Sequence, residues 1–219
     1  TNNNPNTPPE GTSIALSPIP LHTDDLFIAE PQSFDADEDD VNFSYAWHVN
    51  SALVQEGADN TLDGNVHFER GDVVYVAVTP NDGTTDGELS LSDSITVENA
   101  PPDAPVVDIS STNAGLLCAI TTEAVDPDGD PVSYTVEWTV AGAVFTDTQT
   151  TTLPGDTVPV AELVLGSTWT CTITPFDAES EGTAATATYT VGDGSDSGEP
   201  DSGDVDTASP ETDVDADID

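Results

Sequence analysis

Two stretches of sequence decide the fold. Residues 126–138 read DPDGDPVSYTVEW, and residues 35–47 read DADEDDVNFSYAW. In each stretch an acidic loop leads into alternating apolar and polar residues that end on a tryptophan, Trp138 or Trp47. Alternation with a period of two predicts a β-strand with one buried face. The two stretches therefore predict the same loop and strand, present twice in the chain.

Two further blocks repeat in the same order around these stretches. NTPPE at 6–10 matches NAPPD at 99–103, and GDVVYVAVTPND at 71–82 matches GSTWTCTITPFD at 166–177. Three matched blocks at a spacing of about 90–95 residues indicate two tandem copies of one domain. Because turn residues separate short strand-like runs and no long stretch has a helical period, we expect an all-β protein built of two-sheet sandwiches.

The second copy contains the two cysteines, Cys118 and Cys171, in apolar segments on either side of Trp138. Cysteine, tryptophan and cysteine on an early, a middle and a late strand is the arrangement of immunoglobulin-like (Ig-like) sandwiches. Two buried thiols would also fit the apolar context, but the spacing favours a disulfide, whose loop is worth about 4 kcal/mol in the chain-entropy model. In the first copy we expect Ile28 and Val76 at the cysteine positions.

The predicted organisation is two Ig-like β-sandwich domains followed by an acidic tail. The tail consists mainly of Gly, Ser, Pro, Thr and acidic residues, so it buries too little to fold and should be disordered. The chain has no initial Met and no signal-peptide pattern, and we expect a processed protein or an excised fragment. The predicted parts are a linker at 1–9, sandwich 1 at 10–98, a Pro-rich linker at 99–103, disulfide-bridged sandwich 2 at 104–191 and the tail at 192–219.

The chain is extremely acidic, with 43 Asp and Glu residues against one basic residue, Arg70, and a net charge of −42. Such a surface repels phosphates, which excludes nucleic acids and anionic membranes as partners. The lack of lysine excludes Schiff-base chemistry and a Walker-type phosphate loop. A disulfide indicates an oxidising compartment, so we expect an extracellular or cell-surface protein. The charge also fits adaptation to high salt.

The repeat resembles the tandem Ig-like modules, of the cadherin-like and polycystic-kidney-disease (PKD) type, of large bacterial and archaeal surface proteins. The resemblance covers about residues 6–191. It is carried by the two Asn-x-Pro-Pro linkers, DPDGDPVSY at 126–134, Tyr-x-Trp at 45–47, and Thr-Pro-x-Asp at 79–82 and 174–177. It implies a stalk, spacer or adhesive unit of a longer surface protein.

Alternate aspartates in the acidic loops are the candidate metal ligands. Carboxylates two residues apart in an irregular loop can converge on one Ca²⁺, which takes six to eight oxygens. Solvated turns are the alternative, because Asp, Pro and Gly are good turn residues; DADEDD, however, keeps five carboxylates without Pro or Gly. In an Ig sandwich these loops and the linker lie at one end, so we expect Ca²⁺ at the domain junction, as the cadherin resemblance implies. The predicted ligands are Asp126, Asp128, Asp130, Asp177, Glu179, Glu98 and Asp103, with Asp35, Asp37, Asp39 and Asp82 in the first copy.

No catalytic constellation emerges from the sequence. The three histidines share no metal-ligand spacing, and neither cysteine has a nearby His or Lys that would lower its pKa. We therefore expect a non-enzymatic extracellular spacer or adhesive stalk, with Ca²⁺ as a structural cofactor and with other modules of a longer surface protein or cell-surface ligands as partners. The alternative is a carbohydrate-binding accessory module of a secreted hydrolase, which predicts a row of exposed aromatic residues.

Overall fold

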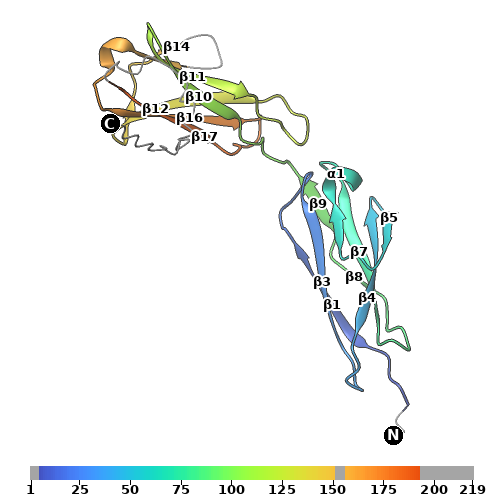
Figure 1. Cartoon of the computed structure of the whole chain (residues 1–219). Helices are drawn as coiled ribbons and strands as arrows, with labels where there is room; N and C mark the ends of the chain where they lie inside the picture. The colour runs from blue at the N-terminus through green and yellow to red at the C-terminus, as the bar shows by residue number, and fades with distance from the viewer. Residues whose placement is uncertain (1–4, 151–155, 193–219) are drawn as a thin grey trace, which may run out of the picture.

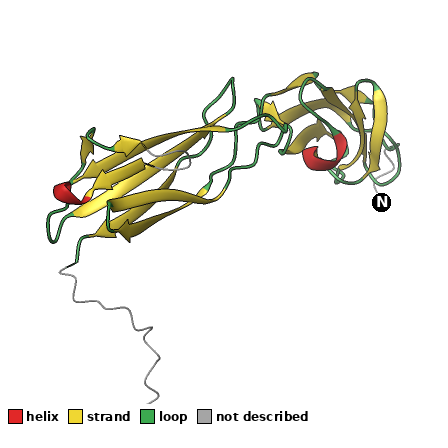
Figure 2. Cartoon of the chain, turned by 90° about the horizontal axis from the view of Figure 1, so that it is seen from above, coloured by secondary structure: helices red, strands yellow, loops and turns green. Residues whose placement is uncertain are grey.

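Both copies fold as antiparallel β-sandwiches, and the two domains are joined end to end (Figures 1 and 2). The computed structural model describes residues 5–150 and 156–192. It confirms the predicted all-β fold with two tandem Ig-like sandwiches. Most of the predicted disordered tail, residues 193–219, lies outside the described residues.

The first domain packs two sheets face to face. Its strands are β1 Glu10–Ser17, β2 Leu21–His22, β3 Leu26–Phe34, β4 Asn42–Val49, β5 Ala52–Gly57, β6 Thr61–Asp63, β7 Val73–Asn81, β8 Ser90–Leu91 and β9 Ile95–Glu98. One sheet has the order β1-β3-β6, and the other has the order β2-β9-β7-β4-β5 with β8 paired to β7. The single-turn helix α1, Gly64–His67, leads from β6 towards β7.

The second domain repeats this architecture. Its strands are β10 Val106–Thr112, β11 Gly115–Thr122, β12 Ser133–Val140, β13 Ala143–Phe145, β14 Gln149–Thr150, β15 Asp156–Pro159, β16 Thr168–Phe176 and β17 Ala185–Thr190, with the 3₁₀ turn η1 at Val160–Glu162. The sheets have the orders β10-β11-β15-β14 and β13-β12-β16-β17. Neither α1 nor η1, the helices of the described part, is long and apolar enough to span a membrane.

The central strands of both domains pair in the same register. Trp47 on β4 lies opposite Val76 on β7, and Trp138 on β12 lies opposite Cys171 on β16. All four side chains are buried. In constant-type immunoglobulin domains the strand that follows the tryptophan strand crosses to the other sheet. Here β5 and β13 stay beside β4 and β12, so the tryptophan strand is interior in both domains.

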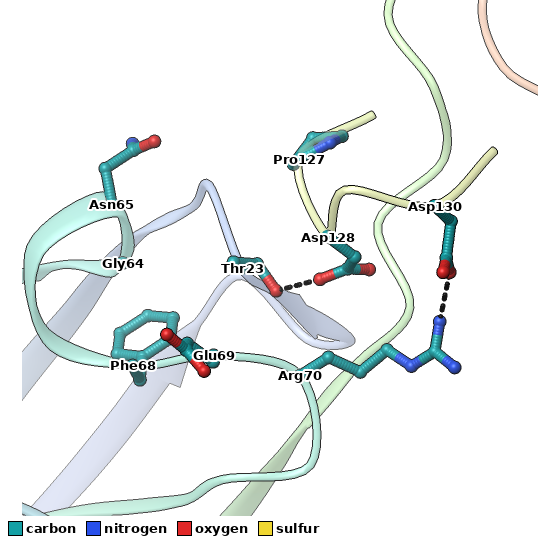
Figure 3. Close-up of a pocket in the computed structure, with 9 residues that line it drawn as sticks. All are labelled: Thr23, Gly64, Asn65, Phe68, Glu69, Arg70, Pro127, Asp128 and Asp130. Carbon is teal, nitrogen blue, oxygen red and sulfur yellow. Dashed lines mark hydrogen bonds and ion pairs between the residues drawn. The ribbon is translucent and has the colours of Figure 1, made fainter. Parts of the chain in front are cut away.

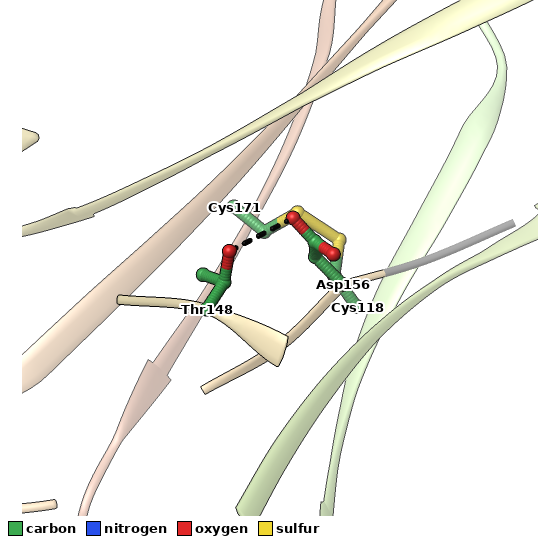
Figure 4. The surroundings of a disulfide bond; sticks show 4 residues. All are labelled: Cys118, Thr148, Asp156 and Cys171. Carbon is green, nitrogen blue, oxygen red and sulfur yellow. Dashed lines mark hydrogen bonds between the residues drawn. A yellow bond between two sulfur atoms is a disulfide. The ribbon is translucent and has the colours of Figure 1, made fainter. Parts of the chain in front are cut away.

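A disulfide joins the two sheets of the second domain, as predicted. Cys118 on β11 and Cys171 on β16 are bonded, with their Cα atoms 6.3 Å apart (Figure 4). Both cysteines are fully buried in a core that also contains Trp138. Near the bridge, the Thr148 hydroxyl donates a hydrogen bond to Asp156 at 3.1 Å. The cross-link therefore lies at the centre of the core.

In the first domain Phe27, not Ile28, occupies the position of Cys118, so the prediction for Ile28 was wrong. Phe27 precedes the acidic loop by the same number of residues as Cys118. It is fully buried and packs on Trp47 with ring centroids 5.6 Å apart, whereas Ile28 is half-buried on the opposite face of β3. A shift of one residue along a strand exchanges its faces. An aromatic ring thus fills the space that the disulfide spans in the second domain.

Substitutions of these two neighbours distinguish the two assignments. Phe27→Ala should destabilise the first domain by about 3–5 kcal/mol, because it leaves a cavity against Trp47. Ile28→Ala removes a half-buried side chain and should cost clearly less. Amide hydrogen exchange of the β4 backbone measures the free energy of opening of this domain alone. Equal effects of the two substitutions would contradict the assignment of Phe27.

The domain junction as the candidate functional site

Two acidic loops of the second domain hold the linker that enters it. The side-chain amide of Asn99 donates to Asp177 Oδ2 at 2.9 Å, and the backbone N–H of Ala100 donates to Asp128 Oδ2 at 2.8 Å. Asp128 belongs to the loop between β11 and β12, and Asp177 to the loop between β16 and β17. We call this pair of contacts the linker clamp. It ties the chain to both loops before the second sandwich begins.

The first domain has the same linker clamp at its own entrance. Asn6 donates its side-chain amide to Asp82 Oδ2 at 2.8 Å, and the backbone N–H of Thr7 donates to Asp37 Oδ2 at 2.8 Å. The three repeated blocks of the sequence therefore meet at one end of each domain. There they bind one another.

Two glycines allow the linker to approach this closely. A Cβ atom on Gly87 would lie 2.2 Å from the carbonyl oxygen of Pro9, and one on Gly182 would lie 2.0 Å from that of Pro102. Both distances are far below van der Waals contact, so no side chain fits at either position. Sequence reasoning missed these glycines, although Gly87 follows Asp82 by five residues and Gly182 follows Asp177 by the same distance.

The first aspartate of each acidic loop shapes the loop from inside. Asp35 and Asp126 are 6% and 7% exposed. Each accepts, through Oδ1, the backbone N–H groups of the residues two and four positions later, at 2.8–3.1 Å. Between the two N–H donors of each loop, one residue has a left-handed backbone conformation: Gly129 in the second domain and Glu38 in the first. This hydrogen bonding explains how DADEDD keeps the same turn without Gly or Pro. In both loops the Oδ2 atom is buried without a hydrogen-bond partner among the described residues.

Arg70, in the loop between α1 and β7, reaches across the junction. Its Nη1 lies 2.7 Å from Asp130 Oδ2 and its Nη2 lies 2.8 Å from Glu179 Oε1. Nη1 also donates to the Asn99 side-chain oxygen. Desolvation lowers the pKa of Arg70, but the charges of Glu179 and Asp130 outweigh it and raise the pKa overall. The single basic side chain of the protein thus lies where we expected a metal ion.

A hollow of about 450 Å³ lies beside Arg70, between the two domains (Figure 3). Thr23, Phe68 and Glu69 line it from the first domain, and Asp128 is among the residues that line it from the second. The Thr23 hydroxyl donates a hydrogen bond to Asp128 Oδ1, which makes a second polar bridge between the domains. Sequence reasoning missed the roles of Thr23 and Arg70.

The structure brings together four of the predicted ligands at the junction: Asp128, Asp130, Asp177 and Glu179. Glu98 and Asp103 have exposed side chains, and Asp39 is exposed at the far end of the first domain. Among residues 5–150 and 156–192, no three His, Cys, Asp or Glu side chains are placed to hold a metal ion together. As arranged here, these carboxylates bind N–H and O–H donors, and calcium binding stays a prediction.

Hydrogen bonds hold Asp177 and Asp82, the clamp aspartates that bind the asparagine amides, in their charged form. The Asn99 amide, followed by the backbone N–H groups of Glu179 and Ser180, keeps the pKa of Asp177 well below its usual range. The Asn6 amide, followed by a backbone N–H, lowers the pKa of Asp82 in the same way. A donor stabilises a carboxylate and not a carboxylic acid. Protonation of either group therefore opposes the linker clamp.

Comparison with known proteins finds likeness in solved structures alone. No family model matches the chain. No curated protein matches it either. The chicken interferon gamma receptor alpha chain is similar at 12% identity, over 84% of this chain and 98% of the other, with a TM-score of 0.47. A two-domain fibronectin type-III segment of chicken tenascin is similar at 12% identity over 84% and 99%, with a TM-score of 0.37. The FN1–FN3 domains of chicken CNTN1 are similar at 16% identity over 84% and 66%, with a TM-score of 0.34. At such identities and scores, the function must be argued from the contacts of this chain.

The linker clamp should weaken in acid. Because the folded state depresses the pKa of Asp177, its contribution is complete above the unfolded-state pKa of about 4 and is lost as the pH falls below it. Asn99→Ala removes the largest cause and should raise the pKa of Asp177, measured by carboxyl-carbon NMR titration. Asn6→Ala is the matched control, since it should move Asp82 and leave Asp177 unchanged. An unchanged Asp177 titration in Asn99→Ala would contradict the clamp.

Proposed function

We propose that this chain is a non-enzymatic segment that holds two Ig-like domains end to end, as a spacer or adhesive stalk of a cell-surface or secreted protein. The observation that carries the proposal is the linkage through Asn99. Its side-chain oxygen accepts from Arg70 of the first domain, and its amide donates to Asp177 of the second. One linker residue therefore couples both domains. A simple flexible tether would not need such coupling.

The geometry of the junction supports a limited range of bending. The linker clamp fixes how the chain enters the second domain, and Pro101 and Pro102 restrict the backbone that follows. The ion pairs of Arg70 and the Thr23–Asp128 hydrogen bond then connect the body of the first domain to the same acidic loops. A force along the chain would pass through these contacts as well as through the linker backbone.

The described side chains give little support to the alternative of a carbohydrate-binding module. Such modules bind sugars on rows of exposed aromatic rings, and the described residues offer one exposed aromatic side chain, Phe34. All three tryptophans are buried. The Cys118–Cys171 disulfide supports a place outside the reducing cytosol. Other modules of a longer surface protein or ligands on a cell surface are the partners that we propose.

Trypsin offers a direct measurement of the junction, because Arg70 is the sole residue after which it can cut. The double variant Asp130→Asn, Glu179→Gln frees the guanidinium, and cleavage of the Arg70–Gly71 bond should accelerate roughly two- to tenfold, as expected for two exposed ion pairs. Mass spectrometry of the two fragments gives the rate. The variant Glu137→Gln, Glu181→Gln has the same net charge and touches neither pair, so it serves as the control.

The same variants should differ in shape. Small-angle X-ray scattering of the Arg70-freeing variant should show a broader distribution of interdomain arrangements than the control variant does. Equal cleavage rates and equal scattering for the two variants would contradict a junction closed by Arg70.

Calcium as an additional stiffening cation is a separate proposal. Four carboxylates (Asp128, Asp130, Asp177 and Glu179) and one guanidinium lie at the junction, which leaves these five groups with a net charge of −3. The hollow also contains Glu69, whose carboxylate is exposed. Excess negative charge in a partly enclosed space attracts hard cations with oxygen ligands.

A calcium titration tests this proposal. If Ca²⁺ binds in the hollow, it should raise the melting temperature more than Mg²⁺ or Na⁺ does at equal ionic strength. Glu69→Gln should reduce that rise, and Glu137→Gln, which removes a distant charge, should not. Equal stabilisation by all three cations would indicate charge screening, and the acidic loops would then be solvated turns.

A further inference from the structure

The N-terminal end of the first domain presents two of the three acceptors that receive Arg70 at the junction. We infer that this end is a docking face for the arginine-bearing end of another module of the same kind. The inference rests on the proposed function, since it extends the contacts of the junction to a second position. The partner is defined by its chemistry: a sandwich domain with a guanidinium in the loop that corresponds to residues 64–72.

The acceptors correspond residue by residue. Asp39 holds the position of Asp130 in its acidic loop, and Asn6 holds the position of Asn99 in the linker. The Asn6 amide donates to Asp82, as the Asn99 amide donates to Asp177. The side-chain oxygen of Asn6 therefore corresponds to the Asn99 oxygen that accepts from Arg70. The Asp39 side chain is exposed. Both acceptors are thus in place for an incoming guanidinium.

A buried carboxylate oxygen adds negative charge next to these acceptors. Asp35 is 6% exposed, and its Oδ2 has no hydrogen-bond partner among the described residues. Together with Glu38, Asp39 and Asp40 it lines a hollow of about 510 Å³. A buried, unpaired carboxylate oxygen favours a positive charge nearby. In the second domain the equivalent Oδ2 of Asp126 is buried without a partner as well, and Arg70 binds Asp130 four residues further along the chain.

A second copy of this whole chain does not supply the missing cation by stacking end to end. The residue that corresponds to Arg70 in the second domain is Leu165, which precedes the repeated glycine as Arg70 does. Leu165 and its neighbour Val164 are exposed, at 66% and 67%. Stacking would therefore place apolar side chains against Asp39. The docking face fits a module that resembles the first domain, not the second.

The docked pair would have one ion pair fewer than the junction. Thr84 holds the position of Glu179, so the guanidinium would meet one carboxylate, Asp39, and the Asn6 oxygen. An exposed ion pair contributes little by itself. We therefore expect docking between covalently linked modules, where the effective concentration is high, and not between separate molecules.

An extended chain tests the inference. A second copy of residues 10–98 is fused to the N-terminal side of residues 6–219 so that Glu98 of the added copy joins Asn6, as Glu98 joins Asn99 in the protein itself. The added copy contains a whole core, because the buried core residues of the first domain lie between Leu21 and Val97. Trypsin then has two Arg–Gly bonds to cut, and the fragment masses tell them apart. Both bonds should be cleaved slowly, the added one somewhat faster than the native one.

Substitutions in the domain that follows the added copy complete the test. Asp39→Asn should accelerate cleavage of the added bond roughly two- to fivefold and leave the native bond unchanged. Glu56→Gln, which removes an exposed charge on β5 outside this hollow, should affect neither bond. Fast cleavage of the added bond, insensitive to Asp39→Asn while the native bond stays protected, would overturn the inference and leave the proposed function intact. Fast cleavage of both bonds would overturn both. Protection of the added bond that disappears in EDTA and returns with Ca²⁺ would replace the guanidinium with a metal ion and overturn the inference as well.

Discussion

Neutral N–H donors, rather than cations, form most of the hydrogen bonds to the carboxylates that shape the acidic loops of both domains. With 43 acidic residues and one arginine, almost none of the carboxylates can form an ion pair within the chain. Asp35 and Asp126 instead accept two backbone N–H groups each, and Asp82 and Asp177 accept backbone N–H groups and an asparagine amide. Hydrogen bonds of this kind favour the ionised carboxylate without a counter-charge. The loops are therefore formed within each domain, and the linker docks as one more donor.

The use of neutral donors also determines how the junction responds to salt. Ion pairs between exposed groups weaken as the ionic strength rises, whereas hydrogen bonds from backbone amides to buried carboxylates are screened much less. Arg70 and its partners are partly exposed, and Asp177 is 4% exposed. In concentrated salt the linker clamp would remain while the Arg70 contacts weaken. A protein with this surface charge thus keeps a defined linker where it would lose much of its ion pairing.

The sequence predicts the fold well because the fold depends on local patterns. Period-two alternation places Trp47 and Trp138 on buried strand faces, and the cysteine–tryptophan–cysteine order predicts the disulfide. The error at Ile28 has a local cause as well. The segment around it contains four consecutive apolar residues, from Leu26 to Ala29, so alternation does not tell which of them face the core. The counterpart of Cys118 could be identified by counting the residues to the acidic loop, because Phe27 and Cys118 precede their loops by the same number.

The candidate site was predicted in part, for a physical reason. The blocks that build each linker clamp are repeated, and the topology of an Ig sandwich predicted that Asp128 and Asp177 lie at one end of the domain, beside the linker. Arg70 occurs once, and its partners Asp130 and Glu179 lie 60 and 109 residues away in the chain. No periodicity or spacing links residues that meet only when two domains come together. The prediction of a cation at the junction was physically reasonable. The composition shows that Arg70 is the one Lys or Arg side chain that could supply the positive charge.

The linker clamp and Arg70 make unequal contributions to the junction. The clamp lies within one domain and joins a linker to loops that the domain has already formed, so it sets the direction in which the chain enters. Arg70 and Thr23 contribute the direct contacts of the first domain with those loops, and both act through exposed or half-buried groups. Contacts of that kind open and close readily. The clamp therefore limits the range of the hinge, and Arg70 selects one arrangement within that range. Leu165 at the corresponding place in the second domain means that this selection operates between these two domains and is not repeated at the other end of the second.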